Sequence, residues 1–209
     1  KANRTATPED LLPQFDFCRR MCEAIGVPCF EADGFEADDV IGTLATRMEA
    51  HGHPVVIVTG DKDMSQLVRN GIQVYDLAKD LWLDEAGVRA KFGVTPVQIP
   101  ELLSLLGDSV DNIPGIPGVG EKTAISLVKE FGSIENLLEN TGRLKGKLKE
   151  KVETHKELAV QSKRLATIIT DVPVELHPED LSIQPWNKDP LRELFSELEF
   201  RRMAEQLGL

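Results

Sequence analysis

The chain has 209 residues, of which 41% are hydrophobic and 28% are charged, and its formal net charge is -11. This length allows one large domain or two small ones with a buried core, and the composition is that of an ordinary globular protein. The negative charge excludes a uniformly basic surface for nucleic acid, so the distribution of the 35 acidic residues becomes decisive. We expect neither a membrane span nor a secretory signal, and the absence of an initial Met indicates a longer parent protein.

The first ninety residues alternate between helical and strand-like patterns. We predict helices at residues 8–24, 36–50 and 63–68, and strands at residues 27–32, 54–59 and 72–77. Residues 81–83 can pair with the last strand, which follows an Asn-Gly turn at residues 70–71. The run 54–59 is β-branched without alternation, which is typical of a strand covered on both faces in a parallel sheet. The order of elements indicates an α/β fold with right-handed crossovers.

Three cysteines lie near the start of the chain, at Cys18, Cys22 and Cys29. An odd number without a second cluster argues against a disulfide framework and fits a reducing cytoplasm. A zinc site would need four well-placed ligands, and no His lies nearby. We therefore expect buried thiols.

After about residue 92 the pattern becomes helical. We predict helices at residues 95–106, 121–131, 134–139, 148–168 and 190–206. A loop rich in glycine and proline, residues 107–120, separates the first two. The natural seam lies near Gly93, so we divide the chain into an α/β part at residues 1–93, a helical part at 94–187 and a terminal helix at 188–209.

Carboxylates are concentrated in three short segments, at residues 36–39, 61–63 and 108–111. Each segment alone has an ordinary explanation, as a helix cap, a turn or a loop. However, residues 61–63 directly follow a strand, and residues 36–39 follow the strand before it. Because ligands of open α/β sheets bind beyond the carboxyl ends of strands, we expect the segments to share one edge.

So many carboxylates on one edge would repel one another unless cations neutralised them. Oxygen ligands without His or Cys select Mg²⁺ or Mn²⁺ rather than zinc. Two such ions can clamp a phosphodiester, one activating water and the other stabilising the leaving oxygen. The sequence therefore favours a metal site over three unrelated structural uses.

The motifs at residues 36–42, 59–64 and 107–124 resemble, in order and spacing, those of the 5′-nuclease domain of bacterial DNA polymerase I. The wider flap endonuclease superfamily is similar, and the likeness runs over essentially the whole chain. The resemblance implies a PIN-like (resolvase-like) parallel sheet with flanking helices, followed by an all-helical, SAM-like helix-hairpin-helix subdomain. The α/β part would be the catalytic core, and the terminal helix would lead toward a polymerase portion.

The resemblance also implies a role for each acidic residue. Metal ligands would be Glu36, Asp38, Asp61, Asp63 and Asp111, with Asp38 close to both ions. Asp39 and Asp108 would be partners that act through water or through the ligands. With Asp38 and Asp61, the catalytic set includes Lys1 and Arg4, which match the end of the family's helical arch, where basic side chains grip the scissile phosphate.

One departure from the family pattern concerns the start of the domain. The family's domain begins with two strands, each ending in an aspartate ligand of the first ion, and neither is present in this sequence. We therefore expect the first metal site to be short of two ligands and the sheet to lack its central strand.

The loop before residue 121 fits a helix-hairpin-helix, whose glycines let backbone N–H groups approach phosphate. The DNA-binding candidates are Gly115, Gly118, Val119, Gly120, Lys122 and Thr123. Such contacts position DNA without reading bases, although a plain turn is the alternative. The resemblance implies a K⁺ ion bound by the loop carbonyls. The basic run 143–151 is either a solvated face or a further contact to duplex phosphates.

We therefore expect a metal-dependent 5′→3′ exonuclease or flap endonuclease that cuts duplex, nicked or 5′-flap DNA and removes RNA primers in bacterial replication and repair. It would use two Mg²⁺ or Mn²⁺ ions, act as a monomer in the cytoplasm at the nucleoid, and be joined to a polymerase portion. One alternative is a truncated DNA-binding module without activity of its own. Another is a different acidic-site Mg²⁺ enzyme, such as a phosphatase or a toxin-type ribonuclease.

Overall fold

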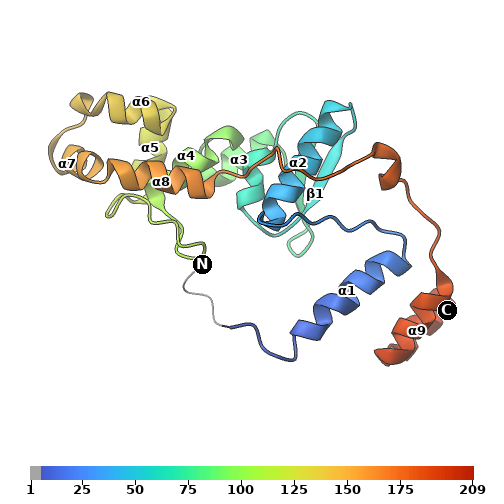
Figure 1. The fold of residues 1–209 in the computed structure, drawn as a ribbon. Coiled ribbons are helices and arrows are strands. Elements are labelled where there is room, and N and C mark those ends of the chain that lie inside the picture. Colours follow the sequence, from blue (N-terminus) through green and yellow to red (C-terminus); the bar gives the residue numbers. More distant parts are fainter. Residues whose placement is uncertain (1–5) are drawn as a thin grey trace. The chain divides into compact units, whose positions relative to one another are not determined.

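The computed structural model describes residues 6–209, and the chain divides into two compact units (Figure 1). The larger unit contains Phe35–Val172. Of the described residues, the smaller unit combines residues 6–34 with Pro173–Leu209. Across residues 6–209, no helix combines the length and the apolar character needed to cross a bilayer.

The larger unit contains a three-stranded sheet in the order β1-β2-β3. The strands are β1 (Val55–Val58), β2 (Ile72–Asp76) and β3 (Leu81–Leu83). β1 and β2 pair in parallel, with Val58 opposite Tyr75, and β3 pairs antiparallel to β2, with Trp82 opposite Tyr75. The predicted strands 54–59 and 72–77, and the pairing of residues 81–83, are confirmed. The sheet is mixed, because its third strand returns through a short turn.

β1 is covered on one face only. Ile57 is 6% exposed and faces the core beside α2 (Ala37–Ala50), whereas Val56 and Val58 on the other face are 45% and 61% exposed. The prediction that both faces would be covered is therefore wrong for the described residues. A β-branched run indicates a strand, but its coverage depends on which other elements pack there.

A short helix, α3 (Glu85–Phe92), follows the sheet and has no counterpart among the predicted elements. Its ends nevertheless carry recognisable signals. The Asp84 carboxylate accepts a hydrogen bond from the Gly87 amide at 2.7 Å, which caps the first turn. Gly93 ends the helix in the left-handed conformation, with φ of 73°. Eight residues between two caps suffice for a helix that the apolar periodicity alone does not reveal.

Helices make up most of the rest of the larger unit, and Figure 1 shows them in colours from green through yellow to orange. They are α4 (Ile99–Leu106), α5 (Glu121–Phe131), α6 (Ile134–Glu139), α7 (Gly146–Thr154) and α8 (Lys156–Ala166). α4 is entered through a 3₁₀ turn and packs against both α5 and α8. Their apolar faces share one continuous core with the sheet, including Ile72, Leu105 and Leu127. α5 and α6 begin and end at the predicted residues.

The predicted helix 148–168 is wrong as a single helix, because the backbone breaks at His155. This residue ends α7 and precedes α8, with φ of -111° and ψ of 22°. Its ring nitrogen Nδ1 lies 2.9 Å from the carbonyl oxygen of Lys151. The apolar spacing continues across the break, with Val152 and Ala159 both fully buried, so periodicity alone does not locate it.

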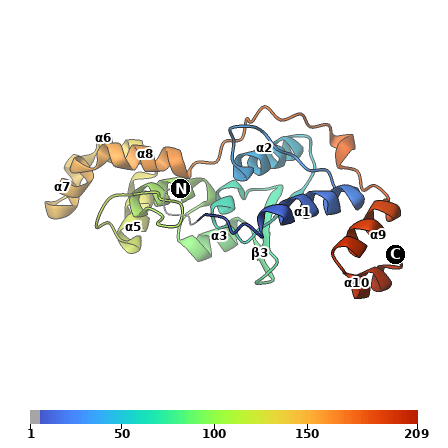
Figure 2. The same ribbon diagram turned by 60° about the horizontal axis from the view of Figure 1, so that its bottom comes forward.

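The smaller unit is helical and has its own small core. It contains α1 (Leu12–Ala24), α9 (Lys188–Glu197) and α10 (Arg201–Leu207), the last two shown in red in Figure 2. α1 packs against α9, burying Ala24, Leu191 and Phe195 together. On the surface, the Arg20 guanidinium binds the Glu197 carboxylate at 2.7 Å.

Two predicted elements of this unit are wrong. Residues 27–32 form no strand: Pro28 has no N–H to donate, and Val27 is 48% exposed. The helix 190–206 is interrupted at Glu199, which has a positive φ of 56°. This turn lets the ring of Phe200 meet the ring of Phe195 edge to face, with centroids 5.9 Å apart.

The start of α1 and the burial of its cysteines also differ from expectation, although the helix ends at Ala24 as predicted. The helix starts at Leu12 with Pro13 in its first turn, not at residue 8. The cysteine thiols are not buried, since Cys18 and Cys29 are exposed and Cys22 is half-buried. They lie on the outward part of a small unit whose core takes only one stripe of α1.

Candidate metal centre and glycine loop

The first acidic segment opens α2. Glu36 is the N-cap, and it forms a reciprocal capping box with Asp39, whose Oδ2 accepts the Glu36 amide at 3.2 Å. The other carboxylate oxygen of Asp39 accepts the amide of Ile169 at 2.9 Å. Asp39 therefore ties the start of α2 to the chain that follows α8, and Asp38 precedes it in the first turn of the helix.

The second acidic segment directly follows β1. The Thr59 hydroxyl oxygen accepts the Asp61 amide at 3.0 Å, and Asp61 Oδ1 accepts the Asp63 amide at 2.9 Å. These bonds turn the chain sharply, so that Asp63 starts a 3₁₀ helix pointing into the molecule. Asp63 is only 9% exposed, and its Oδ1 atom has no hydrogen-bond partner among the described residues.

The third acidic segment is a tight loop after α4. Asp108 and Ile113 exchange two backbone hydrogen bonds of 2.8 Å, which close the loop. Asp111 lies within this closed loop, and its carboxylate is near that of Asp108. Asp108 Oδ1 accepts the Val110 amide at 2.8 Å. The remaining oxygen of the buried Asp108 forms an ion pair with the Lys62 ammonium.

The structure brings these segments together within the larger unit. Carboxylate oxygens of Asp63, Asp108 and Asp111 all lie within 4.8 Å of one another. A pocket of about 290 Å³ collects Asp63 and Asp111 with all three acids of the first segment, Glu36, Asp38 and Asp39. Asp61 lines neither arrangement, but it is hydrogen-bonded to Asp63 at the rim. We call Asp63, Asp108 and Asp111 the acidic triad.

The charges of the triad are only partly compensated. Burial, and then the neighbouring Asp61 carboxylate, raise the pKa of Asp63 to about 6. Burial also opposes ionisation of Asp108, but the Lys62 ammonium and the Val110 amide outweigh it and hold the pKa of Asp108 below its usual range. A buried carboxylate with a raised pKa and an oxygen without a partner is the electrostatic state that a bound cation would relieve.

The chemistry of the triad fits a divalent cation of the hard type. It offers only carboxylate oxygens, close enough to share one ion, and the unpartnered Oδ1 of Asp63 supplies a ligand atom without breaking an existing bond. No His or Cys belongs to the group, which disfavours a structural zinc site.

The glycine loop between α4 and α5 is held by two side chains from α7 and α8. The Gly115 amide donates to the Ser162 hydroxyl at 3.0 Å, and a Cβ at Gly115 would lie 2.4 Å from the Gly107 nitrogen. The Lys151 ammonium donates to the Gly118 carbonyl at 2.7 Å. The second half of the loop is thus fixed at two points by side chains far away in the sequence.

The loop leads directly into α5. Gly120 is the N-cap of that helix and has open space around its Cα, while Val119 is buried beneath it. Lys122 is exposed and Thr123 half-buried in the first turn. The amino terminus of an 11-residue helix and an exposed ammonium therefore lie beside the glycines.

Two basic residues of the pocket region were not candidates from the sequence. Lys62 lies inside the second acidic segment, and its place between two aspartates does not by itself indicate which carboxylate it binds. Arg164 of α8 lines the acidic pocket together with residues 165–169. Gln66 holds this segment, since it accepts the Ile168 amide and donates to the Ala166 carbonyl, both at 3.0 Å. Arg164 reaches the site only through tertiary packing, so no local signal predicts it.

The other candidates from the sequence lie elsewhere. Lys1 and Arg4 are outside the described residues.

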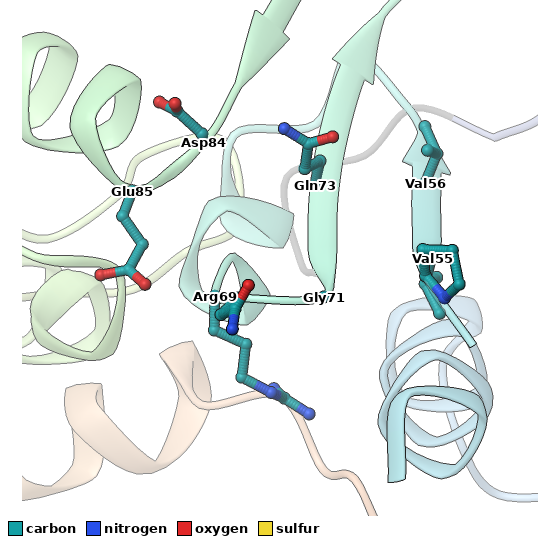
Figure 3. Close-up of a pocket in the computed structure, with 9 residues that line it drawn as sticks. Val55, Val56, Arg69, Gly71, Gln73, Asp84 and Glu85 are labelled. Atoms are coloured by element: carbon teal, nitrogen blue, oxygen red, sulfur yellow. The ribbon is translucent and has the colours of Figure 1, made fainter. Parts of the chain in front are cut away.

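A second pocket, of about 490 Å³, opens at the amino ends of β1 and β2 (Figure 3). There Asp84 caps α3 and the guanidinium of Arg69 binds Glu49, so its charged groups already have structural uses. Ligands of α/β sheets bind at the opposite, carboxyl ends, where the triad lies.

Comparison with solved structures supports this fold. The T5 D15 protein co-crystallised with metal ions superposes with a TM-score of 0.67 at 20% identity, covering 79% of this chain and 64% of that chain. The catalytic core of Rad2 in complex with DNA substrate gives a TM-score of 0.59 at 18% identity, covering 98% of this chain and 65% of that one. The resemblance at this level of identity is one of fold.

Sequence relatives are closer. DNA polymerase I of Bacillus caldotenax is 42% identical over 214 residues, which cover 99% of this chain and 24% of that protein. DNA polymerase I of Bacillus subtilis is 43% identical over 213 residues, covering 100% of this chain and 24% of that protein. The chain therefore spans about a quarter of the length of these relatives.

Two family models match consecutive parts of the chain. Residues 1–93 match the N-terminal resolvase-like domain of the 5′-3′ exonucleases, and residues 94–189 match their C-terminal SAM fold. Both the predicted fold class and the resemblance noted from the motifs are confirmed. Since the two models describe adjoining parts of one protein family and together match nearly the whole chain, this chain belongs to the 5′-3′ exonuclease family.

Proposed function

We propose that the chain is the nuclease part of a bacterial DNA polymerase I and hydrolyses DNA phosphodiesters near 5′ ends, nicks and flaps. The observation that carries the proposal is the convergence of three separated acidic segments on one pocket, with the triad oxygens within 4.8 Å of one another. Membership of the family supports the same activity. Removal of RNA primers and damaged strands in replication and repair would be its use in the cell.

The proposed metal ligands follow from this geometry and from the family resemblance. Asp63 and Asp111, with Asp61 at the rim, would hold one Mg²⁺ or Mn²⁺ ion, and Glu36 and Asp38 would approach a second. Divalent ions supply activation of water and stabilisation of the leaving oxygen in phosphodiester hydrolysis. Both carboxylate oxygens of Asp39 already accept hydrogen bonds, from the amides of Glu36 and Ile169. Asp39 would therefore orient the first turn of α2.

The glycine loop would bind the duplex. Gly115, Gly118, Val119 and Gly120 would let backbone N–H groups approach a phosphate, and Lys122 and Thr123 would add side-chain donors. A K⁺ ion held by loop carbonyls would strengthen that contact. The Gly118 carbonyl faces a cationic group already, since it accepts a hydrogen bond from the Lys151 ammonium at 2.7 Å.

The remaining parts of the proposal concern organisation. Residues 1–93 would form the α/β catalytic part, 94–187 the DNA-binding subdomain, and 188–209 the passage to a polymerase portion. Lys1 and Arg4 would contact the scissile phosphate. The protein would act as a monomer in the bacterial cytoplasm, at nucleoid DNA.

The test is cleavage of a labelled duplex carrying a 5′ flap, with Mg²⁺, with Mn²⁺ and with a chelator. We expect metal-dependent cleavage that Asp63→Ala and Asp111→Ala abolish, because each removes a triad oxygen. Asp16→Ala, an exposed aspartate of α1, is the matched control and should cleave like the unaltered protein. Binding of the flap substrate without cleavage under any metal condition would instead identify a DNA-binding module.

A further inference from the structure

A positively charged side chain of the protein itself, that of Lys62, lies next to the acidic triad. Lys62 lies between Asp61 and Asp63, and its ammonium forms an ion pair with the Oδ2 atom of Asp108. That carboxylate is almost completely buried, with a side chain 4% exposed, whereas the Lys62 side chain is 44% exposed. The charge of the buried Asp108 is therefore compensated by a lysine whose side chain is exposed enough to turn away into solvent.

The ion pair compensates more than one carboxylate. Burial lowers the pKa of Lys62, but the charges of Asp108, Asp63 and Asp111 outweigh that effect and raise it above the usual range. The same ammonium also lowers the pKa of Asp63, against the effects of burial and of Asp61. All three members of the triad thus interact with one ammonium group.

A divalent ion held by Asp63 and Asp111 would lie beside Asp108, because carboxylate oxygens of these three residues all lie within 4.8 Å of one another. Asp108 Oδ2 has no hydrogen bond from the rest of the described chain, and Asp108 Oδ1 is occupied by the Val110 amide. Two cations sharing one small group of carboxylates repel each other, and the divalent ion gains more from the triad than the single charge does.

We propose that Lys62 is the resident counter-cation of the acidic triad, and that a divalent ion must displace its ammonium from Asp108 in order to bind. This inference rests on the metal site of the proposed function. Lys62 then acts as a positioning residue that sets metal affinity: it stabilises the metal-free triad and weakens ion binding. Its released side chain extends into solvent, where it is already partly exposed.

The test is calorimetric titration of the protein with Mn²⁺ at fixed pH, together with thermal unfolding in chelator. We expect Lys62→Met to bind Mn²⁺ about tenfold more tightly, because a competing positive charge is gone, and to unfold at a lower temperature without metal. Lys62→Arg keeps the charge and should bind Mn²⁺ within about threefold of the unaltered protein.

Lys79 provides a matched control. Its ammonium binds Asp76, another buried carboxylate with an exposed lysine partner, at 2.6 Å, and Asp76 is not a member of the triad. Lys79→Met should lower the unfolding temperature in chelator, as Lys62→Met does, while leaving Mn²⁺ affinity within about twofold of the unaltered protein.

The outcomes separate the two hypotheses. Unaltered protein that binds Mn²⁺, combined with a Lys62→Met variant of equal or weaker affinity, overturns the role of Lys62 and leaves the metal site standing. Unaltered protein that binds no Mn²⁺ overturns both. Equal tightening in Lys62→Met and Lys79→Met would also overturn the inference, because it would reduce the effect to overall charge.

Discussion

The hydroxyl of Ser162 on α8 accepts a hydrogen bond from the buried amide of Gly115 at 3.0 Å and itself donates to the Leu158 carbonyl at 2.7 Å. One side chain thereby connects the glycine loop to the helix behind it, across 47 residues of sequence. The relationship matters for function because the loop can present its amides to a phosphate only if its own backbone is fixed.

Removing that hydroxyl should loosen the loop. Ser162→Ala leaves the Gly115 amide buried without a partner, which costs about 1–3 kcal/mol of unfolding free energy. We expect faster hydrogen exchange at the Gly115 amide and weaker binding of duplex DNA. Ser126→Ala, an exposed serine of α5, is the control. Unchanged exchange at Gly115 in Ser162→Ala would show that the hydroxyl does not hold the loop.

The glycines of the loop should differ sharply in their tolerance of alanine. At Gly115, φ is 62° and a Cβ would strike the Gly107 backbone, so Gly115→Ala should lose about 3 kcal/mol or more of stability. Gly120 has a negative φ of -90° and no heavy atom within 4 Å of a Cβ, so Gly120→Ala should lose less than about 1 kcal/mol. Urea unfolding of the two variants gives the comparison, and similar losses would contradict it.

The raised pKa of Asp63 predicts a pH dependence of stability in chelator. Between about pH 4 and pH 6 the folded protein binds a proton at Asp63 that the unfolded chain has already released, so stability should fall as pH rises through this window. Above it, the ionised and buried carboxylate remains a constant penalty. Asp63→Asn should remove this penalty and gain roughly 1–2 kcal/mol at neutral pH, after allowance for solvent screening.

The pH series has its own internal check. Thermal unfolding measured from pH 4 to pH 8 should show a shallower pH dependence for Asp63→Asn than for the unaltered protein. Asp16→Asn, which changes an exposed carboxylate of α1, should leave the slope as it was. Parallel curves for the unaltered protein and Asp63→Asn would show that Asp63 titrates normally in the fold.

The acidic residues of the site were easier to predict from the sequence than the residues that surround them. Each acidic segment carries a local signal: a helix cap at Glu36, a turn after a strand at Asp61, and a tight loop at Asp108. The order of the strands then predicts that these acidic segments lie at the same edge of the sheet. The Lys62 ion pair depends on how the loop after α4 packs beside residues 61–63, and the position of Arg164 depends on how α8 packs. Packing of that kind cannot be recognised from neighbouring residues in the sequence.

The errors in secondary structure have a common cause. Periodicity continues across His155, and apolar residues also flank Glu199, but the backbone turns at both places. There the His155 ring lies near the Lys151 carbonyl, and the Phe200 ring packs against Phe195. Residues 27–32 have strand-like side chains without a neighbour to pair with. Local pattern indicates which conformation a segment prefers, whereas tertiary contacts decide where that conformation stops.

The ion pairs of Lys163 give a last prediction, about the support behind the loop. Its ammonium binds the buried Glu101 at 2.6 Å and the exposed Glu135 at 2.7 Å, and Glu101 also accepts the Ile134 amide at 2.9 Å. Lys163→Met would leave the Glu101 charge buried without its cation, costing about 3 kcal/mol of unfolding free energy. Glu135→Gln, which breaks only the exposed pair, should cost less than about 1 kcal/mol.

A double substitution decides whether the charge or the packing is responsible. In Lys163→Met combined with Glu101→Gln, the side chain that accepts the Ile134 amide is neutral, so most of the lost stability should return. Urea unfolding of the single and double variants measures the coupling between the two positions. Additive losses would mean that Lys163 stabilises α4 and α8 through its aliphatic stem. Recovery would mean that the helices behind the glycine loop are held by a buried ion pair whose partners cannot be removed one at a time.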